Sequence, residues 1–312
     1  RISSDGSLST PTLGTSNVRF GVNAGNSIVS GGNNNTVVGD EAGTAITTGD
    51  LNTALGYLAL AAEDTGGRST AIGAYALSVQ NVDGIVYNTA VGYNAGGAIT
   101  TGLQNTFVGA LAGDATTTAN NNAAFGYSSL STNTTGASNT AIGDNALTAN
   151  TTASNNIAVG RSALLVNTTG ANNVAVGYQA LDANTTASNN TAVGYQALTA
   201  NTTGAGNTAI GTSALGAETT GSNNVIIGQA GQAQTLTSDT VAVGDGALQT
   251  NTKSAKNTAI GRSALRNLNH TSATDGYNTA LGYNAGYAIT TGLKNTLIGG
   301  LAGDAITTGD WN

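Results

Sequence analysis

Side chains that could support catalysis or metal binding are sparse in this chain. His270 is the only histidine and there is no cysteine, so neither a Ser/His/Asp set nor a thiolate metal site can be assembled. Asp40, Asp144 and Asp245 each follow a glycine in a separate part of the chain, without the dense Asp spacing of calcium-binding β-roll repeats. We interpret His270 as a solvated loop residue. The sequence therefore predicts no enzyme, no cofactor and no calcium array, although an isolated ion between chains stays open.

Aromatic rings recur at one spacing and suggest a binding ridge. Six tyrosines directly follow a glycine that ends a short apolar run: Tyr57, Tyr93, Tyr127, Tyr178, Tyr195 and Tyr283. A row of such rings could stack on sugars or on a host surface. The alternative, which we favour, is that the rings only pack over turns.

A second recurring group has the form of a glycosylation signal. Asn-Thr-Thr matches the acceptor pattern for N-linked glycans and would place its asparagines on one ridge. The candidate positions are Asn133, Asn150, Asn167, Asn184 and Asn201. The repeat composition also produces this pattern by itself, so both interpretations stay open.

All of these spacings derive from one repeat of seventeen residues, seen at Asn190–Gly206 and again from Asn207. Self-similarity at a short fixed period predicts a solenoid. Seventeen copies end a short apolar run in glycine, and larger insertions occur around Gln80–Tyr87 and Arg266–Tyr277. Each repeat is predicted to hold two short strands, such as 190–194 and 197–200, joined by two turns. We therefore expect an all-β protein, a parallel β-solenoid or β-roll of about seventeen 17-residue coils.

Composition excludes several classes of partner. Charged residues make up 8% of the 312 residues, and the net charge is −7, which argues against nucleic acid and against a polybasic membrane surface. No apolar run is long enough for a membrane-spanning helix. Residues 1–14 are off the pattern and hold the only proline, Pro11, so we interpret them as a lead-in or cap. Residues 15–312 are expected to form one continuous solenoid domain, truncated or abutting another subunit at its C-terminal end.

The first strand of each repeat is apolar on both faces. Val176, Val193 and Ile210 lie on one face, whereas Ala175 and Ala192 lie on the other. A strand of this kind is buried on both sides. Alanine can line the small interior of the coil, and the Val/Ile face then needs another copy of the chain. The open alternative is a monomer with Val and Ile inside and alanine exposed.

Asparagine begins fifteen of the seventeen repeats, with Ser69 and Thr240 as the departures. Stacked asparagine side chains can hydrogen-bond from coil to coil as a ladder. We therefore predict a structural role for this column.

The repeat resembles short repeats of bacterial and phage-like surface or tail fibres, of the form Asn-Thr-Ala-x-Gly-Tyr-x-Ala-Leu followed by Asn-Thr-Thr-Gly. Asn190–Gly204 carries this match. The repeats are also similar in outline to the head repeats of trimeric autotransporter adhesins, which implies a left-handed parallel β-roll and a homotrimer.

The combined expectation is a structural extracellular fibre or filament segment at a cell or virion surface. It would act as a rigid spacer or adhesive rod whose partners are copies of itself, with end-to-end polymers open. The alternative is a solenoid module that binds a surface glycan or ice through a Tyr or Thr ridge.

Overall fold

The structure is a computed structural model that describes residues 13–312. Most of the predicted lead-in or cap, with Pro11, lies outside the described residues. The chain divides into two compact units, residues 1–155 and 156–312. Residues 13–312 contain strands and turns but no helix, and hence no helix long and apolar enough to cross a membrane.

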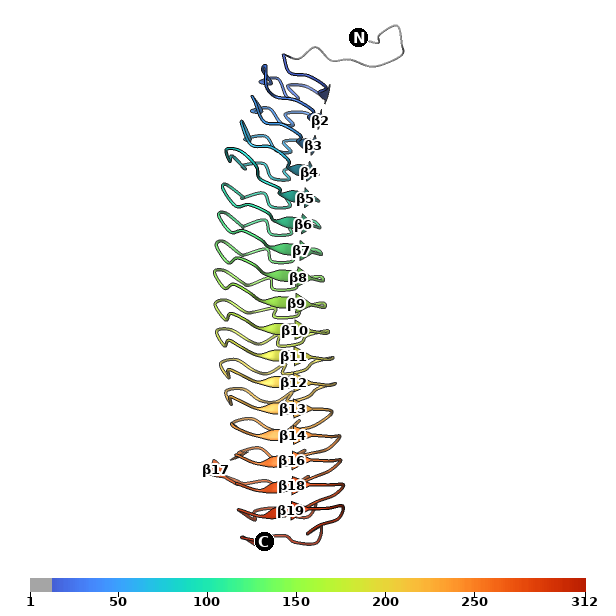
Figure 1. Ribbon diagram of the computed structural model, residues 1–312, viewed down its shortest axis with the longest axis vertical. Coiled ribbons are helices and arrows are strands. Elements are labelled where there is room, and N and C mark those ends of the chain that lie inside the picture. Colours follow the sequence, from blue (N-terminus) through green and yellow to red (C-terminus); the bar gives the residue numbers. More distant parts are fainter. Residues whose placement is uncertain (1–12) are drawn as a thin grey trace. The chain divides into compact units, whose positions relative to one another are not determined.

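The first unit is a parallel β-solenoid in which each coil contributes one three-residue strand, drawn from blue to green in Figure 1. Each strand pairs in parallel with the next one along the chain, and equivalent repeat positions lie side by side. The strands are β1 (Val18–Phe20), β2 (Thr36–Val38), β3 (Thr53–Leu55), β4 (Thr70–Ile72), β5 (Thr89–Val91), β6 (Thr106–Val108), β7 (Ala123–Phe125) and β8 (Thr140–Ile142).

The second unit repeats this architecture, from yellow-green to red in Figure 1. Its coil strands are β9 (Ile157–Val159), β10 (Val174–Val176), β11 (Thr191–Val193), β12 (Thr208–Ile210), β13 (Val225–Ile227), β14 (Val241–Val243), β16 (Thr258–Ile260), β18 (Thr279–Leu281) and β19 (Thr296–Ile298). A short side ladder pairs β15 (Ser254–Ala255) with β17 (Thr274–Asp275). Eight coil strands in the first unit and nine in the second confirm the predicted parallel β-solenoid of about seventeen coils.

The prediction of a second strand in each repeat is wrong, because this segment forms consecutive turns. In the coil of β11, Gln196 and Leu198 adopt left-handed backbone angles, with φ of 51° and 53°. Such angles are unfavourable for a bulky residue. They are offset here because the Leu198 side chain is fully buried and its N–H donates to the Ala214 carbonyl at 3.0 Å. Closing a coil on seventeen residues therefore overrides the strand preference of Ala-Leu-x-Ala.

The glycine after each coil strand is required by both backbone angle and space. Gly194 has φ 138°, a region that residues with a side chain rarely adopt. A Cβ atom at this position would lie 2.4 Å from the Gly211 carbonyl oxygen of the next coil. The glycines therefore let successive turns stack in direct backbone contact.

Coil interiors keep their volume nearly constant by exchanging large and small residues. Most coils bury a leucine such as Leu198, but several carry glycine at that position. A Cβ atom at Gly113 would lie 2.6 Å from the Phe107 ring, and one at Gly43 would lie 2.8 Å from Cδ1 of Ile46. Glycine thus makes room for a larger side chain elsewhere in the interior, as close packing demands.

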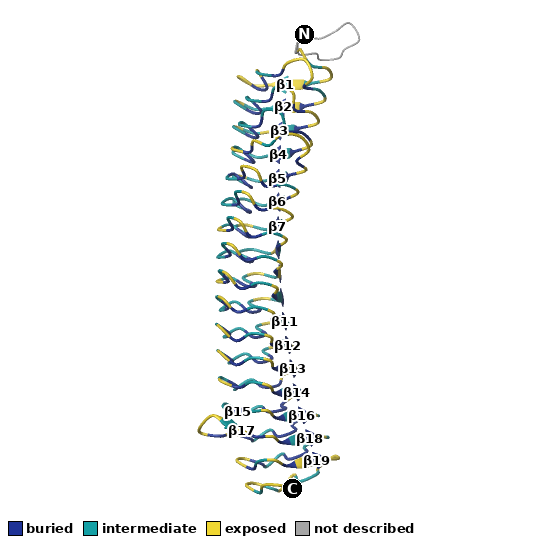
Figure 2. Ribbon diagram, turned by 60° about the vertical axis from the view of Figure 1, so that its left-hand side comes forward, coloured by how far each residue is buried: buried dark blue, intermediate teal, exposed yellow. Residues whose placement is uncertain are grey.

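The predicted asparagine ladder is confirmed within each unit. In the second unit, Asn190 Oδ1 accepts the backbone N–H of Asn207 at 2.9 Å, and Asn190 Nδ2 donates to the Gly204 carbonyl at 2.9 Å. In the first unit, Asn35 Oδ1 accepts from the N–H of Asn52 in the same way. These side chains are buried, and buried residues line the inner side of the coils in Figure 2. The ladder satisfies backbone groups that the short strands leave unpaired.

Candidate functional site

The outward face of the coil strands is uncharged in residues 13–312. Its third-residue column is Val, Ile, Leu or Phe, whereas its first-residue column is mostly threonine. The middle residue of the strand points inward: Ala175 and Ala192 are fully buried, which contradicts the alternative with exposed alanine. The first and third residues point outward, and none of them is charged in the coil strands of residues 13–312. Ile210 and Ile227 are each 38% exposed, and Leu281 is 45% exposed. We call this outward surface the strand face.

The predicted tyrosine row is exposed but interrupted. All six rings lie at the surface, with exposed fractions between 37% (Tyr178) and 57% (Tyr93). Tyr178 and Tyr195 stack with their centroids 5.4 Å apart and an angle of 12° between the planes. Turn packing by itself therefore does not cover these rings.

In the first unit a tyrosine outside the predicted row joins the rings. Tyr75 contacts Tyr57 and Tyr93 edge to face, with centroid distances of 5.4 and 6.0 Å. The negative charge that Tyr75 would carry, together with burial, raises the pKa of Tyr57 above its ordinary value. Tyr75 follows its turn glycine by two residues rather than one, so the spacing did not single it out.

The predicted glycosylation ridge is corrected by the structure. The five asparagines, Asn133, Asn150, Asn167, Asn184 and Asn201, are all fully buried. Asn184 Nδ2 donates to Asn167 Oδ1 at 2.7 Å and to the Ala187 carbonyl at 3.0 Å. These amide nitrogens form a second internal ladder, so a glycan cannot be attached to them in the folded coil. The sequence shows the acceptor pattern but not the direction in which the side chain points.

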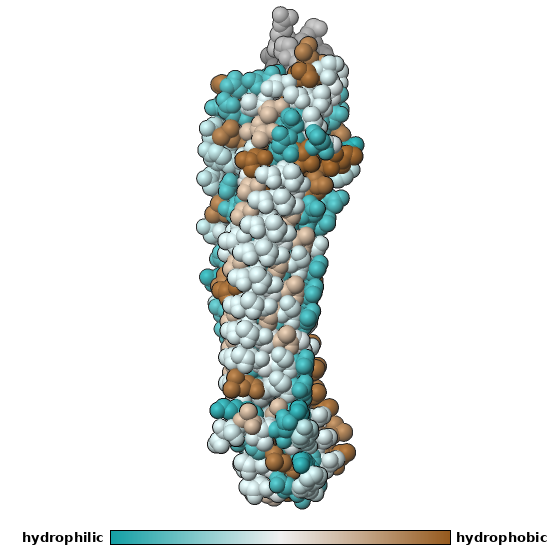
Figure 3. Space-filling view, turned by 90° about the vertical axis from the view of Figure 1, so that its left-hand side faces the viewer, coloured by the Kyte–Doolittle hydropathy of each residue, from teal (hydrophilic) through white to brown (hydrophobic). Residues whose placement is uncertain are grey.

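The side of the coils on which β17 lies in Figure 1 carries the Thr-Thr turns and is mostly pale in Figure 3, the colour of weakly polar residues. The first threonine of each pair uses its hydroxyl internally: Thr185 Oγ1 donates to the Thr202 carbonyl at 3.2 Å, and Thr202 Oγ1 donates to the Thr219 carbonyl at 3.0 Å. The second threonine, such as Thr186, is exposed. A Thr ridge on the turns is therefore only half available to a ligand. The strand threonines, such as Thr191 and Thr208, share the strand face with Val and Ile and are half-buried there.

His270 is buried, which corrects its interpretation as a solvated loop residue. It is 8% exposed, and its Nε2 atom has no hydrogen-bond partner among the described residues. Burial lowers the pKa of His270 below its ordinary value of 6.5, against the smaller opposing effect of Asp310. Among residues 13–312 no group of three or more His, Cys, Asp or Glu side chains could hold a metal ion. Asp245 lies 3.7 Å from Arg262 in an exposed ion pair.

Three cationic side chains at the last position of a repeat lie over the aromatic ring at the same position of the following repeat. Arg68 lies over the Tyr87 ring at 5.7 Å, Lys256 over Tyr277 at 5.4 Å, and Lys294 over Trp311 at 4.2 Å. Sequence reasoning missed the first two pairs because insertions separate their partners by 19 and 21 residues, whereas Lys294 and Trp311 keep the regular spacing of 17. Aligning the last position of every repeat would have placed them in one column.

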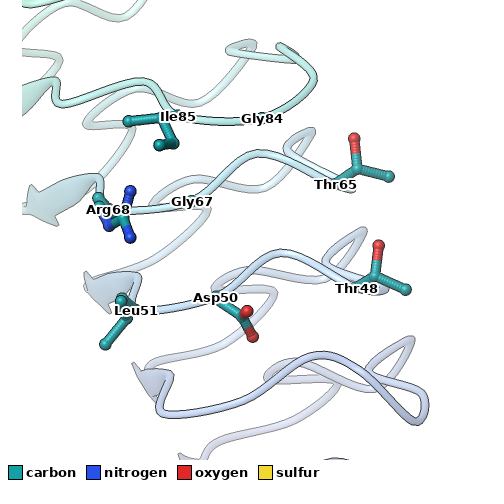
Figure 4. A pocket seen from close by; sticks show the side chains of 8 residues that line it. All are labelled: Thr48, Asp50, Leu51, Thr65, Gly67, Arg68, Gly84 and Ile85. Atoms are coloured by element: carbon teal, nitrogen blue, oxygen red, sulfur yellow. The ribbon is translucent and has the colours of Figure 1, made fainter.

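A groove of about 230 Å³ opens beside the first of these pairs (Figure 4). Its lining includes the exposed Ile85 and Arg68 at one end and two threonine hydroxyls at the other. A Cβ atom at Gly84 would meet no atom within 4 Å, so the groove is open there. The lining residues are Thr48, Asp50, Leu51, Thr65, Gly67, Arg68, Gly84 and Ile85.

Comparison with models of protein families, with curated proteins and with solved structures finds no match for this chain. The geometry described above gives three candidate surfaces: the strand face, the exposed tyrosines, and the cation–aromatic pairs with the groove.

Proposed function

We propose that this chain is a structural segment of an extracellular fibre at a cell or virion surface, in which stacked coils act as a rigid spacer and copies of the chain associate through their strand faces. The observation that carries the proposal is the uncharged, partly exposed strand face. A column of partly exposed Val, Ile, Leu and Phe side chains that repeats from coil to coil is typical of a protein–protein contact. Resemblance to trimeric adhesin heads supports three copies, and the proposal includes no catalytic role.

The exposed apolar area of the strand face determines how many coils must contribute to self-association. Seven outward residues of the second unit are more than a third exposed: Ile157, Ile210, Val225, Ile227, Ile260, Leu281 and Ile298. Fully burying such a side chain contributes roughly 1.5–3 kcal/mol, so burying the remaining exposed part of all seven contributes about 4.5–9 kcal/mol. Association costs about 4–15 kcal/mol. The second unit alone therefore lies near the threshold, and we expect stable association only when the first unit contributes its strand face too.

Rigidity follows from the way each coil is held to the next. Strand pairing, the two asparagine ladders and the threonine hydroxyl ladder all run between consecutive coils of a unit. A solenoid of this kind gains stability from every interface between neighbours. End-to-end joining through the unpaired strand edges of terminal coils is a further mode of assembly in this proposal.

The test is the mass of the purified chain in solution by light scattering, for which we expect three chain masses. Ile210→Lys/Ile227→Lys places two charges on adjacent strands of the strand face and should give single chains. Thr186→Lys/Thr203→Lys adds the same charge at exposed turn positions and should leave the oligomer intact. A wild-type chain that is monomeric at micromolar concentration would refute self-association.

Glycan binding by the tyrosine rings is a second candidate function, favoured by the exposed stacked pair Tyr178 and Tyr195. Aromatic faces of this kind can stack on sugar rings. A glycan that binds wild type should lose affinity when both residues are changed to Ala. Equal affinity of Tyr178→Ala/Tyr195→Ala and wild type would exclude these rings.

A further inference from the structure

Two places in the chain share the same backbone arrangement but differ in one acidic residue. In the first unit an isolated parallel bridge joins Gly67 to Ile85, and in the second unit β15 and β17 join Ala255 to Asp275. The residue after Gly67 or Ala255 is a cation, and the tyrosine two residues after Ile85 or Asp275 lies under that cation. Asp275 in the second unit thus corresponds to Ile85 in the first.

The second place contains its own carboxylate. Asp275 Oδ2 lies 2.6 Å from Lys256 Nζ and accepts a hydrogen bond from the Tyr277 hydroxyl at 3.2 Å. The hydrogen bond from Lys256 lowers the pKa of Asp275 below its ordinary value. The cation and the phenol of this place therefore already hold an anion.

The first place has the cation and the ring without the carboxylate. The Arg68 guanidinium makes no ion pair or side-chain hydrogen bond with another described residue, and the groove lies beside it. In Figure 4 the Asp50 carboxylate points away from Arg68, toward the preceding coil, where it accepts the Asn33 N–H at 2.6 Å. Asp64 accepts from the Thr65 N–H, and Asp83 accepts from the Thr65 hydroxyl. The acidic groups near the groove are therefore engaged, whereas the guanidinium is available.

We propose that this groove binds the carboxylate of an acidic sugar residue, with Arg68 as the bidentate donor and Tyr87 beneath the guanidinium. Arginine is well suited to planar recognition of a carboxylate. The groove volume of about 230 Å³ is smaller than the roughly 300–1,000 Å³ of pockets that enclose drug-sized ligands, so it suits one sugar ring at the surface. The exposed Ile85 and Leu51 side chains can cover the apolar face of that ring, and the Thr48 hydroxyl can contact its hydroxyl groups.

The experiment is a titration of the full chain with a trimer of galacturonic acid, followed by NMR of the Arg68 Nε–H signal. A single exposed charge pair contributes only about 0.2–1 kcal/mol, so we expect weak binding, with a Kd on the order of 1 mM or larger. Ile85→Asp reproduces the internal carboxylate of the second unit and should weaken binding at least tenfold. Asp275→Ile frees Lys256 and should create a second site, seen as new shifts around Tyr277.

Two further variants and three further probes test the role of charge and of the sugar ring. Asp50→Asn removes a negative charge from the groove and should tighten binding, whereas Lys256→Gln should leave the Arg68 titration unchanged. Equal binding of a neutral galactose trimer, or full binding by Ile85→Asp, would overturn the proposal. Equal binding of acetate or of an Asp-rich peptide would overturn the assignment to a sugar.

The site does not depend on self-association. The titration is therefore repeated on Ile210→Lys/Ile227→Lys, in which we expect the same affinity. Loss of binding in that variant would contradict a site contained within one chain.

Discussion

The two insertion-bearing coils solve the same structural problem with different side chains. In both, the chain makes a detour and returns beside the preceding coil, by the Gly67–Ile85 bridge in one and by the β15–β17 ladder in the other. Their interiors differ at the position that lies eleven residues after the start of the repeat, which is Gln80 in the first and Leu268 in the second. The backbone path is therefore compatible with either a polar or an apolar side chain at this position.

The first of these coils closes its interior with a buried polar network. Gln80 Nε2 donates to Glu63 Oε2 and to Ser69 Oγ, each at 2.9 Å, and Gln80 Oε1 accepts from Asn88 Nδ2 at 2.8 Å. Ser69 stands where other coils have the ladder asparagine, and its shorter side chain leaves the space that Gln80 fills. In the second coil Asn257 keeps the ladder position, so the apolar Leu268 suffices.

We expect the largest loss of stability when Gln80 is replaced by leucine, the residue that the second coil has at the equivalent position. Gln80→Leu removes three buried hydrogen bonds and leaves the Glu63 carboxylate without its side-chain donor. Breaking a buried charged network in this way costs about 3–5 kcal/mol. The measurement is equilibrium urea unfolding, combined with amide exchange at Gly66 and Val82, whose N–H groups donate to Glu63.

A double replacement distinguishes polarity from shape in that experiment. Glu63→Leu/Gln80→Leu removes both partners and should recover much of the loss, because no charge remains buried. If the double variant is as unstable as the sum of the two single variants, packing volume rather than the polar network controls this coil.

The two insertion-bearing regions should respond to pH in opposite directions, through Glu63 in the coil that precedes the first insertion and through His270 within the second. Burial raises the pKa of Glu63, against the opposing effect of its hydrogen bonds from Gln80 and the backbone. Between the ordinary value of 4.5 and this raised pKa the folded state binds more protons than the unfolded state, so stability falls as pH rises through that window. The lowered pKa of His270 has the reverse consequence: stability falls as pH drops below 6.5 and through the folded pKa.

Urea midpoints measured from pH 4 to 8 check this contrast. The urea midpoint of wild type minus that of Glu63→Gln should fall as pH rises. The urea midpoint of wild type minus that of His270→Leu should increase as pH rises. Equal slopes for the two variants would show that the buried groups do not govern the two coils separately.

The sequence predicted the parts of this fold that depend on periodicity. The strand 191–193, the inward Ala192 and the ladder at Asn190 follow from alternation and from stacking of identical coils. The left-handed Leu198 could not be predicted, since closure of the coil and a hydrogen bond to the next coil decide it. The burial of Asn201 depends on side-chain direction within a turn. The pairing of Arg68 with Tyr87 depends on how an insertion returns to its neighbour.

We expect the smallest effect on stability at the exposed ion pair that the second coil has and the first coil lacks. Lys256 and Asp275 form a close ion pair, yet their side chains are 39% and 46% exposed. Exposed pairs gain little because water screens them and because two flexible side chains must be ordered. Asp275→Asn should therefore leave the urea midpoint unchanged, while the pKa of Lys256, which this hydrogen bond raises, falls back toward 10.5 in an NMR titration. A clear loss of stability would instead mean that the ion pair holds the β15–β17 ladder together, and that the unpaired Arg68 leaves its own detour weaker.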